Sequence, residues 1–223
     1  MRKTSKTHER RHEIVSLLRE HLAGSSQPSV STVAADYRDP FRTLISTVIS
    51  LRTKDEVTAA ASARLFSRAS TAAGIAALSA EDIARLIYPA GFYNTKAHSI
   101  REIARVIADR FGGTVPRTRE ELLGLPGVGR KTANLVLGLG FGIPAVCVDT
   151  HVHRIPNRLG LVETETPVDT EQALEESLPR EYWIEINGLL VQFGRRVCTP
   201  VSPWCSRCPL THLCRRVGVT RSR

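Results

Sequence analysis

A lysine and an aspartate, Lys131 and Asp149, lie eighteen residues apart in a glycine-rich and apolar stretch that runs from Leu125 to Asp149. Lys131 follows Gly127, Val128, Gly129 and Arg130, where we expect the first turn of a helix. The positive end of the helix dipole disfavours a cation there and favours the uncharged amine, which is a nucleophile. Asp149 ends an apolar segment, where a carboxylate needs a partner or a chemical task. The pair therefore indicates nucleophilic chemistry assisted by a carboxylate.

A simpler interpretation of the same two residues remains open. Lys131 can be a solvated lysine on a tight helical hairpin, and Asp149 can be the N-cap of a helix that begins at Thr150. Short glycine motifs occur often by chance, so this stretch alone does not decide between the two interpretations.

The residues just before Lys131 predict a helix, a glycine hairpin and a second helix. Thr118 and Glu121 have the spacing of a capping box that opens the first helix. Glycines permit positive φ and let a ligand approach the backbone closely. At the start of the second helix, these backbone N–H groups suit a phosphate. The candidate binding residues are Gly127, Val128, Gly129 and Arg130.

Four of the five cysteines gather near the end of the sequence with the spacing C-x6-C-x2-C-x5-C: Cys198, Cys205, Cys208 and Cys214. In a reducing compartment, four cysteines this close together indicate a metal centre. Four thiolates can bind zinc or a [4Fe–4S] cluster, and the single compact loop favours the cluster. Such a cluster could fix the arginine-rich loop as a basic surface, serve stability alone, or do both. Cys147, which lies between valines, is expected to be a core thiol.

The net charge is +9, and the basic residues are unevenly distributed. Residues 195–223 hold seven arginines and no acidic residue. This balance favours a polyanionic partner, nucleic acid first and an anionic membrane surface second, although a merely basic protein has the same charge. No apolar run is long enough to span a membrane, and no secretory signal precedes the first helix. We therefore expect a cytoplasmic protein, nucleoid-associated in a prokaryote, that is not secreted and is free of disulfides.

Hydrophobic periodicity predicts an all-α fold of roughly ten short helices, and no segment alternates with the period of a strand. Apart from the two helices of the hairpin, the expected helices span residues 9–23, 39–50, 55–67, 79–88, 95–111, 150–159, 171–178 and 181–195. The helix at 150–159 contains Pro156, which is expected to interrupt it.

Four features together resemble the endonuclease III family of helix-hairpin-helix DNA repair glycosylases with β-lyase activity. They are L-P-G-V-G-R-K-T-A at 125–133, V-D-T-H-V at 148–152, G-F-Y-N-T-K-A at 91–97 and the cysteine spacing. The resemblance extends from about Phe41 to Cys214.

The resemblance implies a monomer with two helical lobes and double-stranded DNA lying across the cleft between them. Residues 35–143 would form one lobe with the helix-hairpin-helix motif. Residues 1–34 and 144–223 would form the other, with a [4Fe–4S] cluster on the loop at 198–214.

By the same resemblance, Lys131 is the catalytic lysine and Asp149 the catalytic aspartate. The substrates would be oxidised pyrimidines and abasic sites in duplex DNA. Lys131 would displace the base of a flipped-out nucleotide, and a Schiff base would then allow β-elimination. Two alternatives remain: a mismatch-specific thymine or uracil glycosylase of the same fold, and a non-catalytic cluster-containing DNA-binding protein.

Two positions depart from the family pattern. Arg52 stands where the family commonly has glutamine, and Leu123 stands where some bacterial members carry an acidic residue. The resemblance makes Arg52 the finger that enters the gap left by a flipped nucleotide. We hypothesise that it favours lesions opposite guanine, because arginine can pair bidentately with that base. The alternative is a surface arginine that contacts only phosphate.

Overall fold

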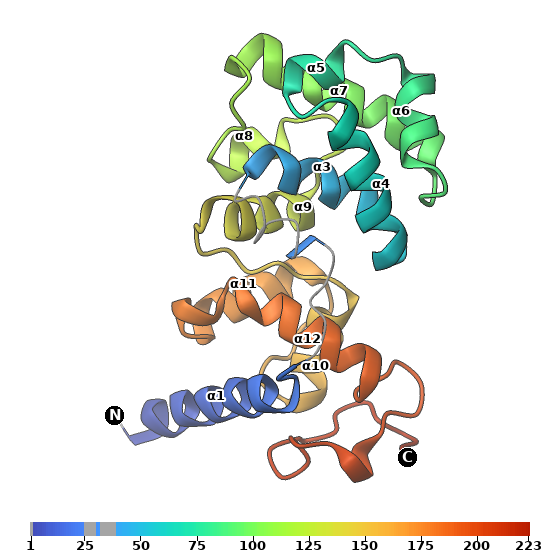
Figure 1. Cartoon of the computed structure of the whole chain (residues 1–223). Coiled ribbons are helices and arrows are strands. Elements are labelled where there is room, and N and C mark those ends of the chain that lie inside the picture. Colours follow the sequence, from blue (N-terminus) through green and yellow to red (C-terminus); the bar gives the residue numbers. More distant parts are fainter. Residues whose placement is uncertain (1, 25–29, 32–38) are drawn as a thin grey trace. The chain divides into compact units, whose positions relative to one another are not determined.

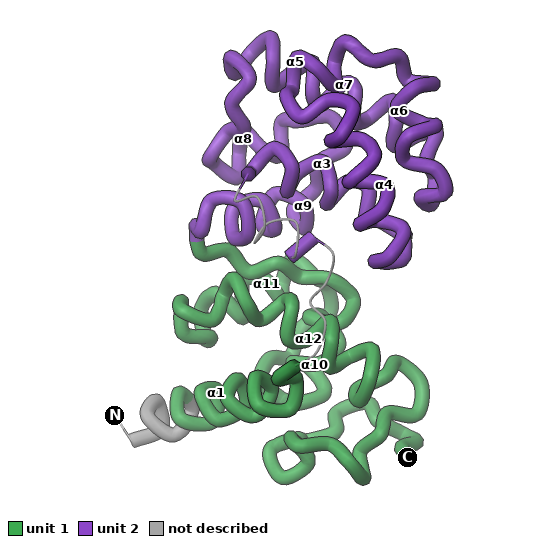
Figure 2. The backbone as a smooth tube through the Cα atoms, viewed as in Figure 1, with its two compact units in different colours: residues 1–27, 144–223 green, residues 28–143 purple. Residues whose placement is uncertain are grey.

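The computed structural model describes residues 2–24, 30–31 and 39–223, and within those ranges every regular element is helical. The all-α prediction is therefore confirmed. The chain divides into two compact units (Figure 2). Unit 1 consists of Met1–Gln27 with Pro144–Arg223, and unit 2 of Pro28–Ile143. The lobe boundary expected between residues 34 and 35 lies outside the described residues.

Unit 2 is a bundle of short helices (Figure 1). Helix α7 packs against α5 and α6, while α3 packs against α4, α7, α9 and the π-helical turn η1. The elements are α3 (Pro40–Ser50), α4 (Asp55–Arg68), α5 (Ala72–Ala76), α6 (Ala80–Ile87), α7 (Tyr93–Phe111), α8 (Arg119–Leu123), α9 (Arg130–Leu135) and η1 (Val136–Gly140).

Side-chain caps start three of these helices where the sequence predicts them. Asp39 accepts from the N–H of Phe41 at 2.8 Å, ahead of the proline that begins α3. Ser79 accepts from the N–H of Asp82, and Thr118 accepts from the N–H of Glu121. Each cap satisfies a donor that the first helical turn leaves unpaired.

The apolar run after Lys131 differs from the regular helix that its spacing predicts. Helix α9 ends at Leu135, and the chain continues as one π-helical turn from Val136 to Gly140. A β-carbon at Gly140 would lie 3.0 Å from Cα of Pro40, so this turn packs directly on the start of α3. Hydrophobic spacing does not distinguish a π-helical turn from a regular helix.

Unit 1 is built around a buried apolar core to which α1, α10, α11 and α12 all contribute. Helix α12 packs against α1 and α10, and α10 packs against α11. The elements are α1 (Arg2–His21), α10 (Thr150–Leu159), α11 (Pro167–Ser177), the 3-10 turn η2 (Arg180–Tyr182), α12 (Glu185–Arg196) and the 3-10 turn η3 (Cys205–Arg207).

Four expected helices of unit 1 are corrected. Helix α1 begins at Arg2 and α11 at Pro167, both earlier than expected. Helix α10 runs through Pro156 without a break, because the proline is buried with Leu159 among apolar side chains and this packing outweighs the lost hydrogen bond. The helix expected at 181–195 begins only at Glu185, after η2. None of the described helices combines the length and the apolar character needed to cross a bilayer.

Candidate functional site

The glycine hairpin of unit 2 has the predicted helix–turn–helix form. Helix α8 ends at Leu123, and the N–H of Val128 donates to the carbonyl of Leu125 at 3.1 Å to close the turn. Gly127 has φ of +71°, the left-handed region that favours glycine, and Val128 anchors the turn by burying its side chain. Gly129 is exposed and immediately precedes α9. The turn is thus fixed on its apolar side and open at its glycines.

Lys131 is the second residue of α9, in the first helical turn, as the sequence predicts. Its side chain is half-buried, and so is that of Arg130. The next residues, Thr132 and Ala133, are buried. Lys131 therefore stands at the border between the protein interior and the exposed glycine turn.

Asp149 lies in unit 1 and caps α10, so the simpler interpretation of this residue is correct as far as it goes. Its Oδ1 accepts from the N–H groups of His151 at 2.8 Å and Val152 at 2.9 Å. Both bonds use the same oxygen, and the side chain is half-buried. Because the cap needs only one of the two oxygens, capping and a chemical role for the carboxylate are compatible.

Helix α10 also connects Asp149 to the cysteine loop. Arg154 donates from Nη2 to the carbonyl of Cys198 at 2.8 Å, and Arg158 donates from Nη1 to the carbonyl of Thr199 at 2.7 Å. Burial lowers the pKa of the Arg154 guanidinium. Helix α10 therefore has Asp149 at its start, and two arginines of its later turns bind the backbone at and beside Cys198.

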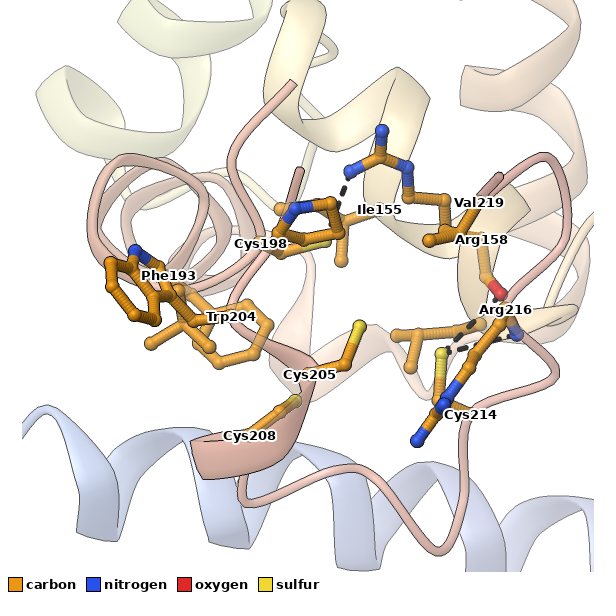
Figure 3. Close-up of a pocket in the computed structure, with 13 residues that line it drawn as sticks. Ile155, Arg158, Phe193, Cys198, Trp204, Cys205, Cys208, Cys214, Arg216 and Val219 are labelled. Atoms are coloured by element: carbon orange, nitrogen blue, oxygen red, sulfur yellow. Dashed lines mark hydrogen bonds between the residues drawn. The ribbon is translucent and has the colours of Figure 1, made fainter. Parts of the chain in front are cut away.

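The four cysteines of the predicted metal centre all line one cavity in unit 1 (Figure 3). Cys198 and Cys214 receive polar contacts: Arg158 Nη1 lies 3.6 Å from the sulfur of Cys198, and the N–H of Arg216 donates to the sulfur of Cys214 at 3.4 Å. Phe193 and Trp204 contribute apolar walls. Burial raises the pKa of the Cys208 thiol to about 11. The cavity thus brings together four free thiols from one loop, with hydrogen-bond donors beside two of them.

Within the described residues, no three His, Cys, Asp or Glu side chains are gathered tightly enough to hold a single metal ion. Cys147, by contrast with the loop cysteines, is buried in the core as expected.

The basic end of the chain folds back over the cysteine loop. The N–H of Arg223 donates to the carbonyl of Pro203 at 2.8 Å, and the N–H of Ser206 donates to the carbonyl of Arg223 at 2.9 Å. The guanidinium groups of Arg207 and Arg223 each lie 4.1 Å from the ring centre of Trp204. Some arginines of the basic tail therefore have a structural role in addition to their charge.

Arg52 lies in unit 2, in the turn between α3 and α4. It is exposed and has φ of +52°, which is unusual for a residue with a side chain. Its guanidinium lies 5.5 Å from the ring centre of Phe92, which also has positive φ and is 63% exposed. Gly91 permits this arrangement, because a β-carbon there would lie 2.4 Å from the carbonyl oxygen of Arg52. Leu123, the other departure from the family pattern, is exposed at the end of α8.

Sequence reasoning missed the role of Lys96, the buried lysine beside this turn. Only 7% of its surface is exposed. The signal was present, because Lys96 has the same helical spacing as Ile100, Ile103 and Ile107, all of which are fully buried. A lysine on an apolar stripe requires internal hydrogen-bond acceptors.

Comparisons with known proteins place the chain in a family. Residues 45–180 match the HhH-GPD superfamily of base excision DNA repair proteins. Endonuclease III of Thermotoga maritima is 54% identical over 176 residues, which cover 79% of this chain and 83% of the relative. Endonuclease III of a Synechocystis species is 38% identical over 96% of this chain and 95% of the relative.

Solved structures agree with this placement. A trapped covalent intermediate of endonuclease III with DNA superposes with a TM-score of 0.80 at 35% identity, covering 92% of this chain and 96% of that one. A thermostable thymine-DNA glycosylase also superposes with a TM-score of 0.80, at 28% identity over 93% of this chain and 96% of that one. The chain belongs to the endonuclease III family of base excision repair enzymes, which are DNA glycosylases with AP lyase activity and act on damaged duplex DNA.

Proposed function

We propose that this chain excises oxidised pyrimidines from duplex DNA with Lys131 as the nucleophile and cleaves the resulting abasic site by β-elimination. The observation that carries the proposal is the place of Lys131, half-buried in the first turn of α9 and directly after an exposed glycine turn. The motif that contains it is the most specific part of the family resemblance.

The other lysines whose side chains the structure describes, Lys54 and Lys96, suit this chemistry less. Lys96 is buried and makes three internal hydrogen bonds, so its amine is engaged. Lys54 is exposed just before α4 and lies outside the glycine turn.

The reaction begins with a flipped-out nucleotide, because a base cannot be attacked inside the stack. The uncharged amine of Lys131 attacks C1′ of the sugar, the bond from C1′ to the base breaks, and the base leaves with the electron pair and a proton. The bond from C1′ to the ring oxygen then breaks as that oxygen takes up a proton, which leaves an iminium between Nζ and C1′. This iminium acidifies the C2′ hydrogen; loss of that proton and departure of the 3′ phosphate break the strand. Water then hydrolyses the iminium and restores Lys131.

Asp149 assists these steps through its carboxylate. Positive charge develops on the sugar as the base leaves, and a carboxylate can stabilise such charge and relay protons. The backbone N–H groups at Gly127, Val128 and Gly129, with Arg130, hold a phosphate of the same strand. Arg52 fills the gap that the flipped nucleotide leaves.

The four loop cysteines hold a [4Fe–4S] cluster in this proposal. Members of the family generally carry one, and the donor set here is four thiols around one cavity. A polynuclear cluster spreads its four ligands more widely than a single ion does, which suits thiols that line a cavity without converging on one point. The cluster supplies a cross-link that fixes the loop, and the steps above do not depend on it.

Covalent trapping tests the nucleophile. Borohydride should cross-link the purified protein to a duplex that contains an abasic site or thymine glycol. Lys131→Ala should bind the duplex but lose the cross-link, base release and strand cleavage. Lys54→Ala is the matched control and should trap like the wild type. An undiminished adduct with Lys131→Ala would place the nucleophile elsewhere. A guanine–thymine mismatch duplex in the same assay distinguishes the mismatch-specific alternative, which would release normal thymine.

Metal analysis tests the cluster. Yellow-brown protein with about four irons per chain is expected. Cys205→Ser should lose the colour and the iron, while Cys147→Ser, which changes a core thiol, should keep both. One zinc per chain without iron would overturn the assignment.

A further inference from the structure

Lys96 makes three hydrogen bonds that surround the turn of Arg52. Its Nζ donates to the carbonyl of Ile49 at 2.6 Å, to the carbonyl of Leu51 at 2.5 Å and to the hydroxyl of Thr53 at 2.8 Å. A lysine ammonium has three donors, so this set uses all of them. Two of the acceptors flank Arg52 directly in the sequence.

The acceptors belong to the end of a helix. Ile49 lies in the last turn of α3 and Leu51 is its C-cap, where carbonyl groups lack helical partners. An ammonium at the negative end of a helix dipole is favourable. Lys96 itself lies near the start of α7, where a cation is unfavourable, and it is buried. The ammonium therefore stabilises the end of α3 and the turn after it, and it does not stabilise α7.

The turn needs this support because Arg52 has a strained backbone. Left-handed φ in a residue with a side chain persists only where the surroundings hold it. Thr53 adds a second tie: its hydroxyl also accepts from the N–H of Gly91 at 3.1 Å, next to Phe92. Through Thr53, the ammonium joins the Arg52 turn to the Phe92 turn on which the guanidinium of Arg52 rests.

We infer that Lys96 is the positioning residue of Arg52: its ammonium holds the turn from Leu51 to Thr53 so that the guanidinium of Arg52 is presented to DNA. The inference rests on the proposed role of Arg52 in filling the gap beside a flipped nucleotide. It concerns geometry alone, and Lys96 does not touch the DNA in this account.

The charge state of Lys96 matters to this role. An uncharged amine has two donors and a lone pair, so one of the three oxygens would lose its bond and face that lone pair. Burial lowers the pKa of Lys96 to about 8, because an ammonium removed from water loses hydration. The charged groups of the turn, Arg52 and Lys54, are exposed. The Arg52-dependent part of activity should thus fall as the pH rises through about 8.

The first test measures the turn without DNA. Lys96→Met keeps a long side chain and removes the ammonium. Amide hydrogen exchange at Thr53, whose N–H donates to the carbonyl of Ser50 at 3.1 Å, should become about tenfold faster, as expected for loss of charged hydrogen bonds. Lys54→Met removes an exposed lysine of the same turn and should leave exchange unchanged. Equal exchange in Lys96→Met and the wild type overturns the inference. If Lys96→Met proves too unstable to measure, Thr53→Val is a milder change. Amide exchange at position 53 should then still be faster than in the wild type, because one acceptor of Lys96 is lost.

The second test separates positioning from general stability. Excision rates for lesions opposite each of the four bases should be measured for Arg52→Ala, Lys96→Met and the double variant, from pH 7 to 9. Lys96→Met should lose the part of the rate that depends on Arg52, and the double variant should match Arg52→Ala. The wild-type rate should approach that of Arg52→Ala above about pH 8. Additive losses in the double variant overturn the inference. If Arg52→Ala keeps wild-type rates, the proposed role of Arg52 is wrong. The hydrogen-exchange result would then still show whether Lys96 holds the turn.

Discussion

Gly194 of α12 and His151 of α10 approach each other so closely that a β-carbon at position 194 would lie 2.2 Å from Nδ1 of His151. Glycine at this position lets α12 pack against the first turn of α10, which Asp149 caps. Gly194→Ala should therefore force the two helices apart and lower the free energy of unfolding by about 1–3 kcal/mol, as over-packing does. Denaturant unfolding measures this. Unchanged stability would show that the His151 side chain simply moves aside.

Asp149 can be tested for capping and for chemistry separately. Asn is as good an N-cap as Asp, so Asp149→Asn should keep the stability of α10 while it removes the charge. We expect base excision to fall by about 10²-fold or more, with DNA binding retained. Asp149→Ala should lose the same activity and about 1 kcal/mol of stability in addition. Near wild-type excision by the Asn variant would restrict Asp149 to its capping role.

The two glycines of the hairpin should respond differently to alanine. Gly127 has φ of +71°, so Gly127→Ala should cost roughly 1 kcal/mol of stability. Gly129 has φ of −96°, and a β-carbon there would meet no atom within 4 Å. Gly129→Ala should therefore fold with normal stability. If its amide holds a phosphate, affinity for duplex DNA should still fall about tenfold, because the new methyl group blocks that approach. Normal affinity in Gly129→Ala would place the phosphate elsewhere.

The lowered pKa of Lys96 also changes the stability of the whole protein. This effect of pH is opposite in direction to the expected loss of Arg52-dependent activity. Its pKa is lowered from 10.5 to about 8 in the folded state, so between these values the unfolded chain binds more protons. Stability must therefore rise with pH in that window, and the cost of burying the charge is fully present below pH 8. Denaturant unfolding at pH 7.5 and 9.5 should show this gain in the wild type and a smaller one in Lys96→Met. The same gain in both would mean that the pKa of Lys96 is not lowered, so that its amine stays charged in the folded state across this range.

Local signals in the sequence predicted most helix starts correctly. Asp39 before Pro40, Ser79 before Asp82 and Thr118 before Glu121 each supply a cap whose geometry involves only neighbouring residues. Features that depend on distant contacts were not predictable. Pro156 is buried in the core of unit 1, where α10 continues through it, and the π-helical turn lies against Pro40.

The same distinction applies to the site. The four cysteines were predicted from spacing, and they do line one cavity. The sequence did not show that Arg158, from a different helix, donates to the loop that carries them. Lys96 was visible only as a lysine with the spacing of buried isoleucines, and its three acceptors lie more than forty residues earlier in the chain.

Arg52 should determine which base opposite the lesion is preferred. Flipping a nucleotide leaves an unstacked gap and an orphaned partner base, and filling that gap offsets part of a cost of a few kcal/mol. Arg52 is exposed, its turn is held by internal hydrogen bonds, and its guanidinium already rests on the ring of Phe92. A planar guanidinium can stack in the gap and donate two hydrogen bonds to guanine as a charged group. Glutamine has only a neutral amide to offer.

We therefore expect Arg52→Gln to lose the preference for lesions opposite guanine while it keeps much of the excision rate. Arg52→Ala should lose rate with all four opposite bases, and most of all with guanine, where a bidentate pair contributes about 1–3 kcal/mol, or roughly tenfold to a hundredfold in rate. Single-turnover excision of one lesion opposite each of the four bases measures this. Lys54→Ala, which removes a neighbouring positive charge, controls for a general loss of phosphate attraction. A uniform loss in Arg52→Gln and Arg52→Ala, equal to that in Lys54→Ala, would assign Arg52 to phosphate contact alone.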